Sequence, residues 1–117
     1  MLTLDGLKAR GAHVEEGLSR CMNNEAFYLK LVGMALQDGG FATLKTALEQ
    51  GDCKTAFEAS HALKGVLGNL SLTPLFDAAS TLTELFRNKA AGDPVPPEAA
   101  PAAEALFAAY ADFSALL

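Results

Sequence analysis

Five stretches of this chain repeat apolar residues at the spacing of an α-helix, and turn-forming residues separate them. The expected helices cover residues 25–37, 41–50, 53–70 and 74–90, and a last helix begins between residues 98 and 101. Ile and Trp are absent and Val occurs only four times, whereas Ala occurs 22 times and Leu 19 times. Strand-favouring residues are therefore scarce and helix formers abundant. The sequence predicts an all-α protein.

The ends of these helices carry residues with a clear structural role. Asn24, Asp52 and Thr73 are predicted N-caps, Gly51 fits a helix C-terminus, and Pro74 fits a first helical position. The connections are short, so neighbouring helices are expected to run in opposite directions. We expect an antiparallel up-down four-helix bundle, with one or two short additional helices in the first twenty residues.

Apolar stripes along the predicted helices indicate which faces form the core. In residues 25–37 the stripe is Phe27, Leu31 and Met34 or Ala35. In the last helix, aromatic residues 107, 110 and 113 fit either a core or a partner surface, and we favour the core. The 117 residues are enough for one hydrophobic core, so a single domain over residues 1–117 is expected.

Charge and composition restrict the classes of partner. The net charge of −5 provides no basic field for nucleic acid or an anionic membrane, so protein partners are favoured. Neither a signal peptide nor an apolar run long enough to cross a membrane is seen, and a cytoplasmic location is expected. Cys21 and Cys53 are far apart and read as small buried thiols.

His61 is the strongest candidate for a chemically reactive residue. On the helix predicted for residues 53–70, most of the apolar side chains, including Leu63, Leu67 and Val66, fall opposite His61. The imidazole is therefore expected to face solvent. Two glycines, Gly65 and Gly68, lie on the His61 face, although each costs a helix about 1 kcal/mol relative to Ala.

These glycines would leave the imidazole accessible, and Lys64 would add a positive charge one turn away. Close helix packing is the alternative reason for them, and it fits less well because they lie away from the apolar stripe. The set therefore looks like an exposed nucleophile prepared to hold a phosphoryl group. An ordinary exposed histidine is the alternative that spacing leaves open.

The segment from Ser60 to Leu75, SHALKGVLGNLSLTPL, resembles the signature of histidine-containing phosphotransfer (HPt) domains. In that signature, Lys and Gly follow the histidine at three and four residues, and a small residue and a polar one come next. A weaker resemblance extends over residues 14–20 and 27–31. Ser71 departs from the pattern, because many members have Gly just before the next helix.

The resemblance implies a role for each matching residue. His61 would accept the phosphoryl group, Lys64 would neutralise its oxygens, and Gly65 would leave room for the partner's active site. Gly68 and Asn69 would border the docking surface. Helical spacing also places Phe57 on the His61 face, where we expect an exposed aromatic for docking, flanked by Lys54 and Lys64. Glu84 and Arg87 are the nearest candidates for polar residues beside the phosphate on the neighbouring helix.

The implied function is transfer in a two-component phosphorelay, with response-regulator receiver domains and a hybrid sensor histidine kinase as partners. The receiver would supply Mg²⁺, and the chain itself needs no cofactor. No P-loop or glycine-rich nucleotide motif occurs, so neither kinase nor ATPase activity is expected. The expected state is a free-standing monomer, although a fragment of a larger kinase would look the same.

Two other functions are compatible with the residues. The first is a helical adaptor that docks a receiver or another protein without accepting phosphate. The second is a metal site in the bundle, for which only Glu58 and His61 show the Glu-x-x-His spacing, so no metal site is predicted. His13 is interpreted as a surface or capping residue.

Overall fold

The computed structural model describes residues 1–117 as seven helices with no strand. In chain order they are α1 (Leu4–Ala9), α2 (Val14–Arg20), α3 (Glu25–Leu36), α4 (Gly40–Gln50), α5 (Cys53–Asn69), α6 (Thr73–Phe86) and α7 (Ala99–Ser114). The molecule is elongated, with extents of 44 × 23 × 20 Å. No helix is both long and apolar enough to span a lipid bilayer.

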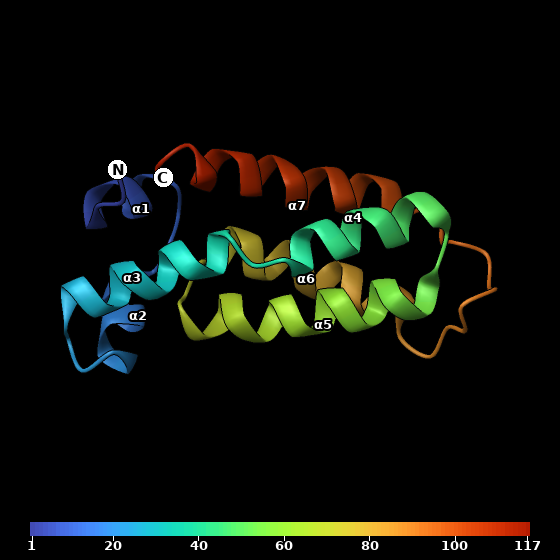
Figure 1. Ribbon diagram of the computed structural model, residues 1–117, viewed down its shortest axis with the longest axis horizontal. Helices are drawn as coiled ribbons and strands as arrows, with labels where there is room; N and C mark the ends of the chain where they lie inside the picture. The colour runs from blue at the N-terminus through green and yellow to red at the C-terminus, as the bar shows by residue number, and fades with distance from the viewer.

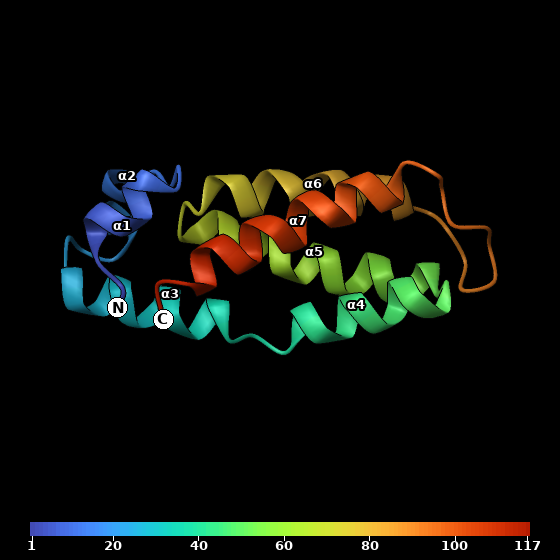
Figure 2. The same cartoon turned by 90° about the horizontal axis from the view of Figure 1, so that it is seen from above.

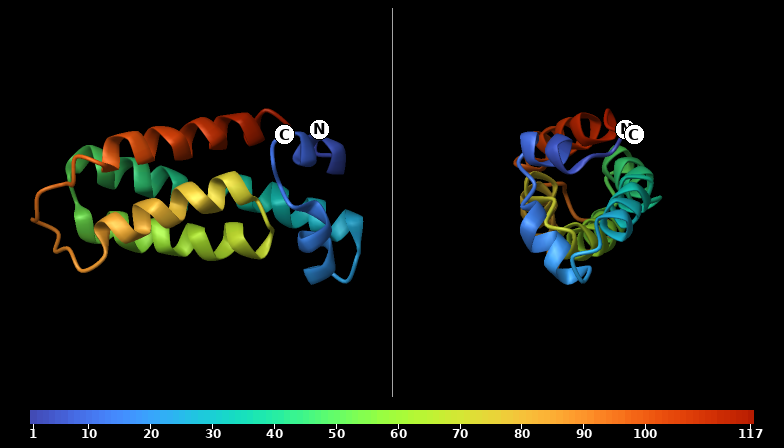
Figure 3. Two further views of the ribbon diagram at one scale, coloured as in Figure 1. Left: turned by 180° about the vertical axis from the view of Figure 1, so that it is seen from behind. Right: turned by 90° about the vertical axis from the view of Figure 1, so that its left-hand side faces the viewer.

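The helices form an antiparallel up-down bundle of four rods (Figure 1). The first rod consists of α3 and α4, which follow each other along one edge with a break between them (Figure 2). Helices α5, α6 and α7 are the other three rods, and α1 and α2 lie across one end (Figure 3). The predicted fold class is confirmed, including the two short N-terminal helices.

The core runs the length of the bundle, and α7 contributes aromatic side chains to it. The Phe41 ring of α4 stacks on the Tyr110 ring with their centroids 4.0 Å apart, and the Tyr110 hydroxyl donates to the Leu36 carbonyl at 2.9 Å. Phe113 is fully buried and Phe107 packs against the core. The aromatic residues of α7 therefore belong to the core, as predicted. Cys21 and Cys53 are buried free thiols, also as predicted.

The predicted buried stripe of α3 is wrong at two of its positions. Phe27 is 47% exposed and Met34 is 60% exposed, whereas the helix buries Tyr28, Val32 and Leu36, together with Ala35, the predicted alternative to Met34. The sequence EAFYLKLVGMAL is apolar on nearly every side, so helical spacing alone cannot identify its inner face. The same error affects Val66 of α5, which was expected in the core and is 37% exposed. Of these exposed side chains, Met34 and Val66 line the same apolar groove on the surface.

Helix ends agree with the sequence except around α6. The side chains of Asn24 and Asp52 accept bonds from the backbone N–H groups of Phe27 and Thr55, and Gly51 takes the left-handed conformation. Thr73 is not a cap: it is the first residue of α6, and Leu72 occupies the cap position. Helix α6 ends at Phe86 rather than near residue 90, since Arg87 leaves the helical conformation and Asn88 has a φ of 64°.

Helix α2 lies against the bundle through Gly17. A Cβ atom on Gly17 would lie 2.8 Å from the Leu70 carbonyl oxygen and would overlap the Tyr28 ring. Tyr28 is fully buried, and its hydroxyl donates to the Leu70 carbonyl at 2.8 Å. Burial raises the pKa of Tyr28 to about 12. The glycine thus allows α2 to approach the turn between α5 and α6.

Candidate functional site

His61 is exposed in the middle of α5, as predicted, and opens onto a hollow of about 570 Å³. Helices α2, α5 and α6 border the hollow, together with the turn between α5 and α6. Its lining includes five residues of α5, namely His61, Lys64, Gly65, Gly68 and Asn69. The remaining lining residues are His13, Glu16, Arg20, Ser71, Thr73, Phe76 and Asp77.

The two glycines of α5 differ in what surrounds them. No atom lies within 4 Å of a Cβ built on Gly65, so its surroundings are open space. A Cβ on Gly68 would lie 3.0 Å from the Phe76 ring of α6. Gly65 therefore fits the prediction of an accessible surface beside His61. At Gly68 the prediction against close packing was wrong, because the glycine makes room for Phe76.

Lys64 carries a positive charge into the hollow without a partner. Lys8, Arg10, Arg20 and Arg87 each form an ion pair, whereas no carboxylate oxygen lies within 4.0 Å of the Lys64 amine. The nearby Lys64 charge contributes to lowering the pKa of Glu84, after the larger effect of the hydrogen bond from Arg87. An unpaired cation one turn from a histidine is suited to binding an anion there.

The imidazole of His61 stacks on the ring of Phe57, one turn earlier in α5. The ring centroids are 5.6 Å apart and the planes differ by 10°. The guanidinium carbon of Arg87 lies 5.5 Å from the centroid of the Phe57 ring, and Arg87 donates to both carboxylate oxygens of Glu84, at 2.9 and 3.1 Å. Phe57 is partly buried, not the exposed aromatic that was predicted.

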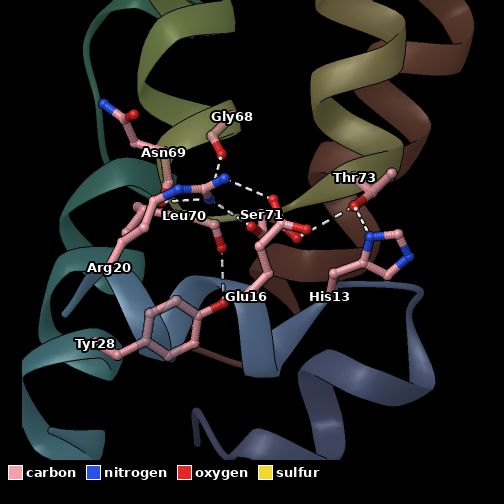
Figure 4. Close-up of polar contacts among 9 residues, drawn as sticks. All are labelled: His13, Glu16, Arg20, Tyr28, Gly68, Asn69, Leu70, Ser71 and Thr73. Atoms are coloured by element: carbon pink, nitrogen blue, oxygen red, sulfur yellow. Dashed lines mark hydrogen bonds and ion pairs between the residues drawn. The ribbon is translucent and has the colours of Figure 1, made fainter. Parts of the chain in front are cut away.

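Arg20 of α2 binds the C-terminal end of α5 (Figure 4). Its guanidinium donates to the carbonyls of Gly68 and Asn69, at 3.1 and 3.2 Å, and to the Ser71 hydroxyl at 2.7 Å. A fourth hydrogen bond, from Arg20 to Glu16 at 2.6 Å, lowers the pKa of the Glu16 carboxyl. A cation at this position complements the exposed carbonyls of the helix end.

Ser71 stands where the HPt pattern has Gly, and its φ of 56° is in the left-handed region. The backbone N–H of His13 donates to the Ser71 carbonyl at 2.9 Å. Together with Arg20, this bond holds a serine in a conformation that glycine adopts without strain. The His13 ring lies 3.3 Å from the Thr73 hydroxyl and makes no cap bond to α2 (Figure 4).

The predicted site residues therefore fall into two groups. His61, Lys64, Gly65, Gly68 and Asn69 meet at the hollow, whereas Lys54, Phe57, Glu84 and Arg87 do not line it. The sequence reasoning missed His13, Arg20 and Asp77, which come from other elements. Arg20 lies 48 residues or more from its partners in the turn, so no local spacing could have indicated it. No cluster of three or more His, Cys, Asp or Glu residues that could hold a metal ion is present.

Comparison with known proteins yields one match. Residues 38–113 match the model of a family described as the Hpt domain. This range includes α4, α5 and α6 and nearly all of α7. No curated protein and no solved structure matches the chain. Since the match covers well over half of the sequence and includes His61 with its surroundings, the chain belongs to the Hpt domain family.

Proposed function

We propose that this protein carries phosphoryl groups in a two-component phosphorelay. His61 accepts the group from a phospho-aspartate of one receiver domain and passes it to another receiver. The observation that carries this proposal is the exposed imidazole of His61 between open space at Gly65 and the unpaired Lys64. A hybrid sensor kinase at the head of the relay and a cytoplasmic setting follow from this role.

In the forward step, a neutral ring nitrogen of His61 attacks the phosphorus atom in line with the aspartyl oxygen. The new N–P bond forms as the P–O bond breaks, and the carboxylate leaves with the electron pair. The receiver supplies Mg²⁺, while Lys64 lies one turn away to stabilise the charge on the phosphoryl oxygens. The chain contributes the nucleophile and one cation, and it needs no cofactor of its own.

The function is tested by incubating the full chain with a panel of receiver domains carrying labelled phospho-aspartate. Transfer to the chain, giving a label that is lost in acid and retained in alkali, supports a phosphohistidine carrier. Binding of a receiver with no transfer from any donor would instead support the adaptor. If no receiver transfers phosphate to the chain and none binds it, the proposal fails altogether.

The structure favours a different docking surface from the predicted one at Phe57. Leu31 and Met34 of α3 meet Val66 and Asn69 of α5 in an apolar groove of about 330 Å³. Asn69 also lines the hollow of His61, so the groove borders the candidate site. We therefore assign the receiver to this groove, with an apolar face of the receiver against α3.

Replacement of Met34 by Glu is expected to weaken receiver binding roughly tenfold, because a charge would replace an apolar contact. Labelling of His61 by the small donor phosphoramidate should remain unchanged. Calorimetric titration with a receiver measures the affinity. Met22→Glu is the matched control, since Met22 is 90% exposed at the turn before α3 and lies outside the groove. Equal loss in both variants would contradict the assignment.

Gly65→Ala is expected to stabilise the fold by up to about 1 kcal/mol, because alanine favours the helix and meets no neighbouring atom. Transfer from the receiver should nevertheless slow, since the methyl group occupies space that the partner's active site needs. Thermal unfolding and transfer kinetics measure the two effects. A more stable variant with undiminished transfer would show that Gly65 has no part in access.

A further inference from the structure

We infer that Phe57 is a positioning residue for the His61 imidazole, fixed in place by the ion pair of Arg87 and Glu84. The inference rests on the proposed function and assigns to Phe57 a role other than docking. Its basis is a continuous series of contacts from the end of α6 to the imidazole.

The first contact orients the imidazole. Rotation about the last side-chain bond of a histidine is broad, so an exposed imidazole has no fixed plane. Phe57 precedes His61 by four residues, which places both rings on the same face of α5. Their planes are nearly parallel, 10° apart, and their centroids are 5.6 Å apart, within the range of distances that aromatic pairs prefer. The stack therefore limits the imidazole to a narrow range of planes.

The second contact fixes Phe57 itself. Arg87 lies 5.5 Å from the Phe57 centroid, within the range of a cation–π interaction. Its guanidinium is oriented by two hydrogen bonds to Glu84, which leave it little freedom to rotate. Arg87 directly follows the last residue of α6, Phe86, and its guanidinium reaches the Phe57 ring of α5. The ring of Phe57 is thus held by a group outside its own helix.

The orientation of the imidazole plane matters for the proposed phosphoryl transfer. A ring nitrogen attacks with a lone pair that lies in the plane of the imidazole, so the ring plane must contain the line to phosphorus. Fixing that plane before the partner arrives raises the fraction of encounters that can react. A docking role suits Phe57 less well, because it is partly buried and already in contact with His61 and Arg87.

The test compares Phe57→Leu with Phe57→Tyr, which restores an aromatic ring, in the full-length chain. Phe107→Leu is the matched control, because Phe107 is a partly buried aromatic of α7 outside the hollow. Three quantities are measured: the receiver affinity, the single-turnover transfer rate at saturating receiver, and the NMR shifts of the His61 ring protons, assigned with His61→Gln.

Phe57→Leu should slow transfer roughly three- to tenfold, which corresponds to the loss of one aromatic pair, with the receiver affinity unchanged. The His61 ring protons should move downfield as the ring current of Phe57 disappears. Phe57→Tyr should restore both rate and shift, and Phe107→Leu should alter neither.

Several outcomes would overturn the inference. The first two are an unchanged transfer rate in Phe57→Leu and an equal loss of transfer rate in Phe107→Leu. The third is a Phe57→Leu variant that loses receiver affinity but keeps its transfer rate, which would restore the docking role of Phe57. The NMR shifts need no phosphate donor. If the wild-type chain accepts no phosphoryl group, the proposed function fails, while an unchanged shift in Phe57→Leu shows separately that the stack does not exist.

Discussion

His61→Gln is expected to abolish phosphoryl acceptance, with the label falling at least about a hundredfold, to the background of the assay. The glutamine side chain has similar length and polarity, but its amide nitrogen has no available lone pair for attack on phosphorus. The His61 side chain is exposed and its ring packs only on Phe57, so the fold should be unaffected. Transfer from a phosphorylated receiver and phosphoramidate labelling both measure the loss.

His13→Gln is the control for this experiment, because His13 lines the same hollow and is the only other histidine. It should leave the label intact, since its ring lies beside Thr73 rather than beside Lys64 and Gly65. A label that disappears with His13→Gln and persists with His61→Gln would show that His13, not His61, is the nucleophile. A label that survives both changes would exclude a phosphohistidine.

Gly17→Ala is expected to cost the fold about 3 kcal/mol. Its methyl group would overlap the Tyr28 ring and the Leu70 carbonyl, so α2 would have to move away from the bundle. If the Tyr28 ring moved instead, its hydroxyl would lose the hydrogen bond to the Leu70 carbonyl and be left buried without a partner. The loss should exceed the helix-propensity gain of about 1 kcal/mol from alanine. Denaturant unfolding followed by circular dichroism measures it.

The matched control is Gly33→Ala in α3. A Cβ there would meet only the Leu2 side chain, at 3.4 Å, which is an ordinary contact. We expect equal or slightly higher stability for this variant. If Gly17→Ala were as stable as Gly33→Ala, the close approach of α2 to Tyr28 would not exist in solution.

The sequence was most informative where a residue acts through its own helix. The exposure of His61 and the presence of Gly65 and Lys64 beside it follow from helical periodicity, and the caps at Asn24 and Asp52 follow from local chemistry. Each of these features depends only on residues of the same helix or of its immediate ends. The sequence of that one segment is therefore sufficient to predict them.

Predictions failed where a second element decides. Gly68 is required by Phe76, which lies in another helix, and the inner face of α3 is chosen by its neighbours because both faces are apolar. Arg20 reaches the turn between α5 and α6 only through the tertiary fold. Under the proposed function, the exposed stripe of α3 is apolar enough for a core but lies at the interface with the receiver.

The break between α3 and α4 also separates the groove-lining residues of α3 from the segment that carries His61. The family match begins at residue 38, in this break, and the apolar stripe of α3 lies before it. Under the proposed function, the nucleophile and its stack belong to the shared part, and much of the recognition belongs to α3. Substitutions confined to α3 would then alter one wall of the receiver groove and leave the chemistry at His61 unchanged.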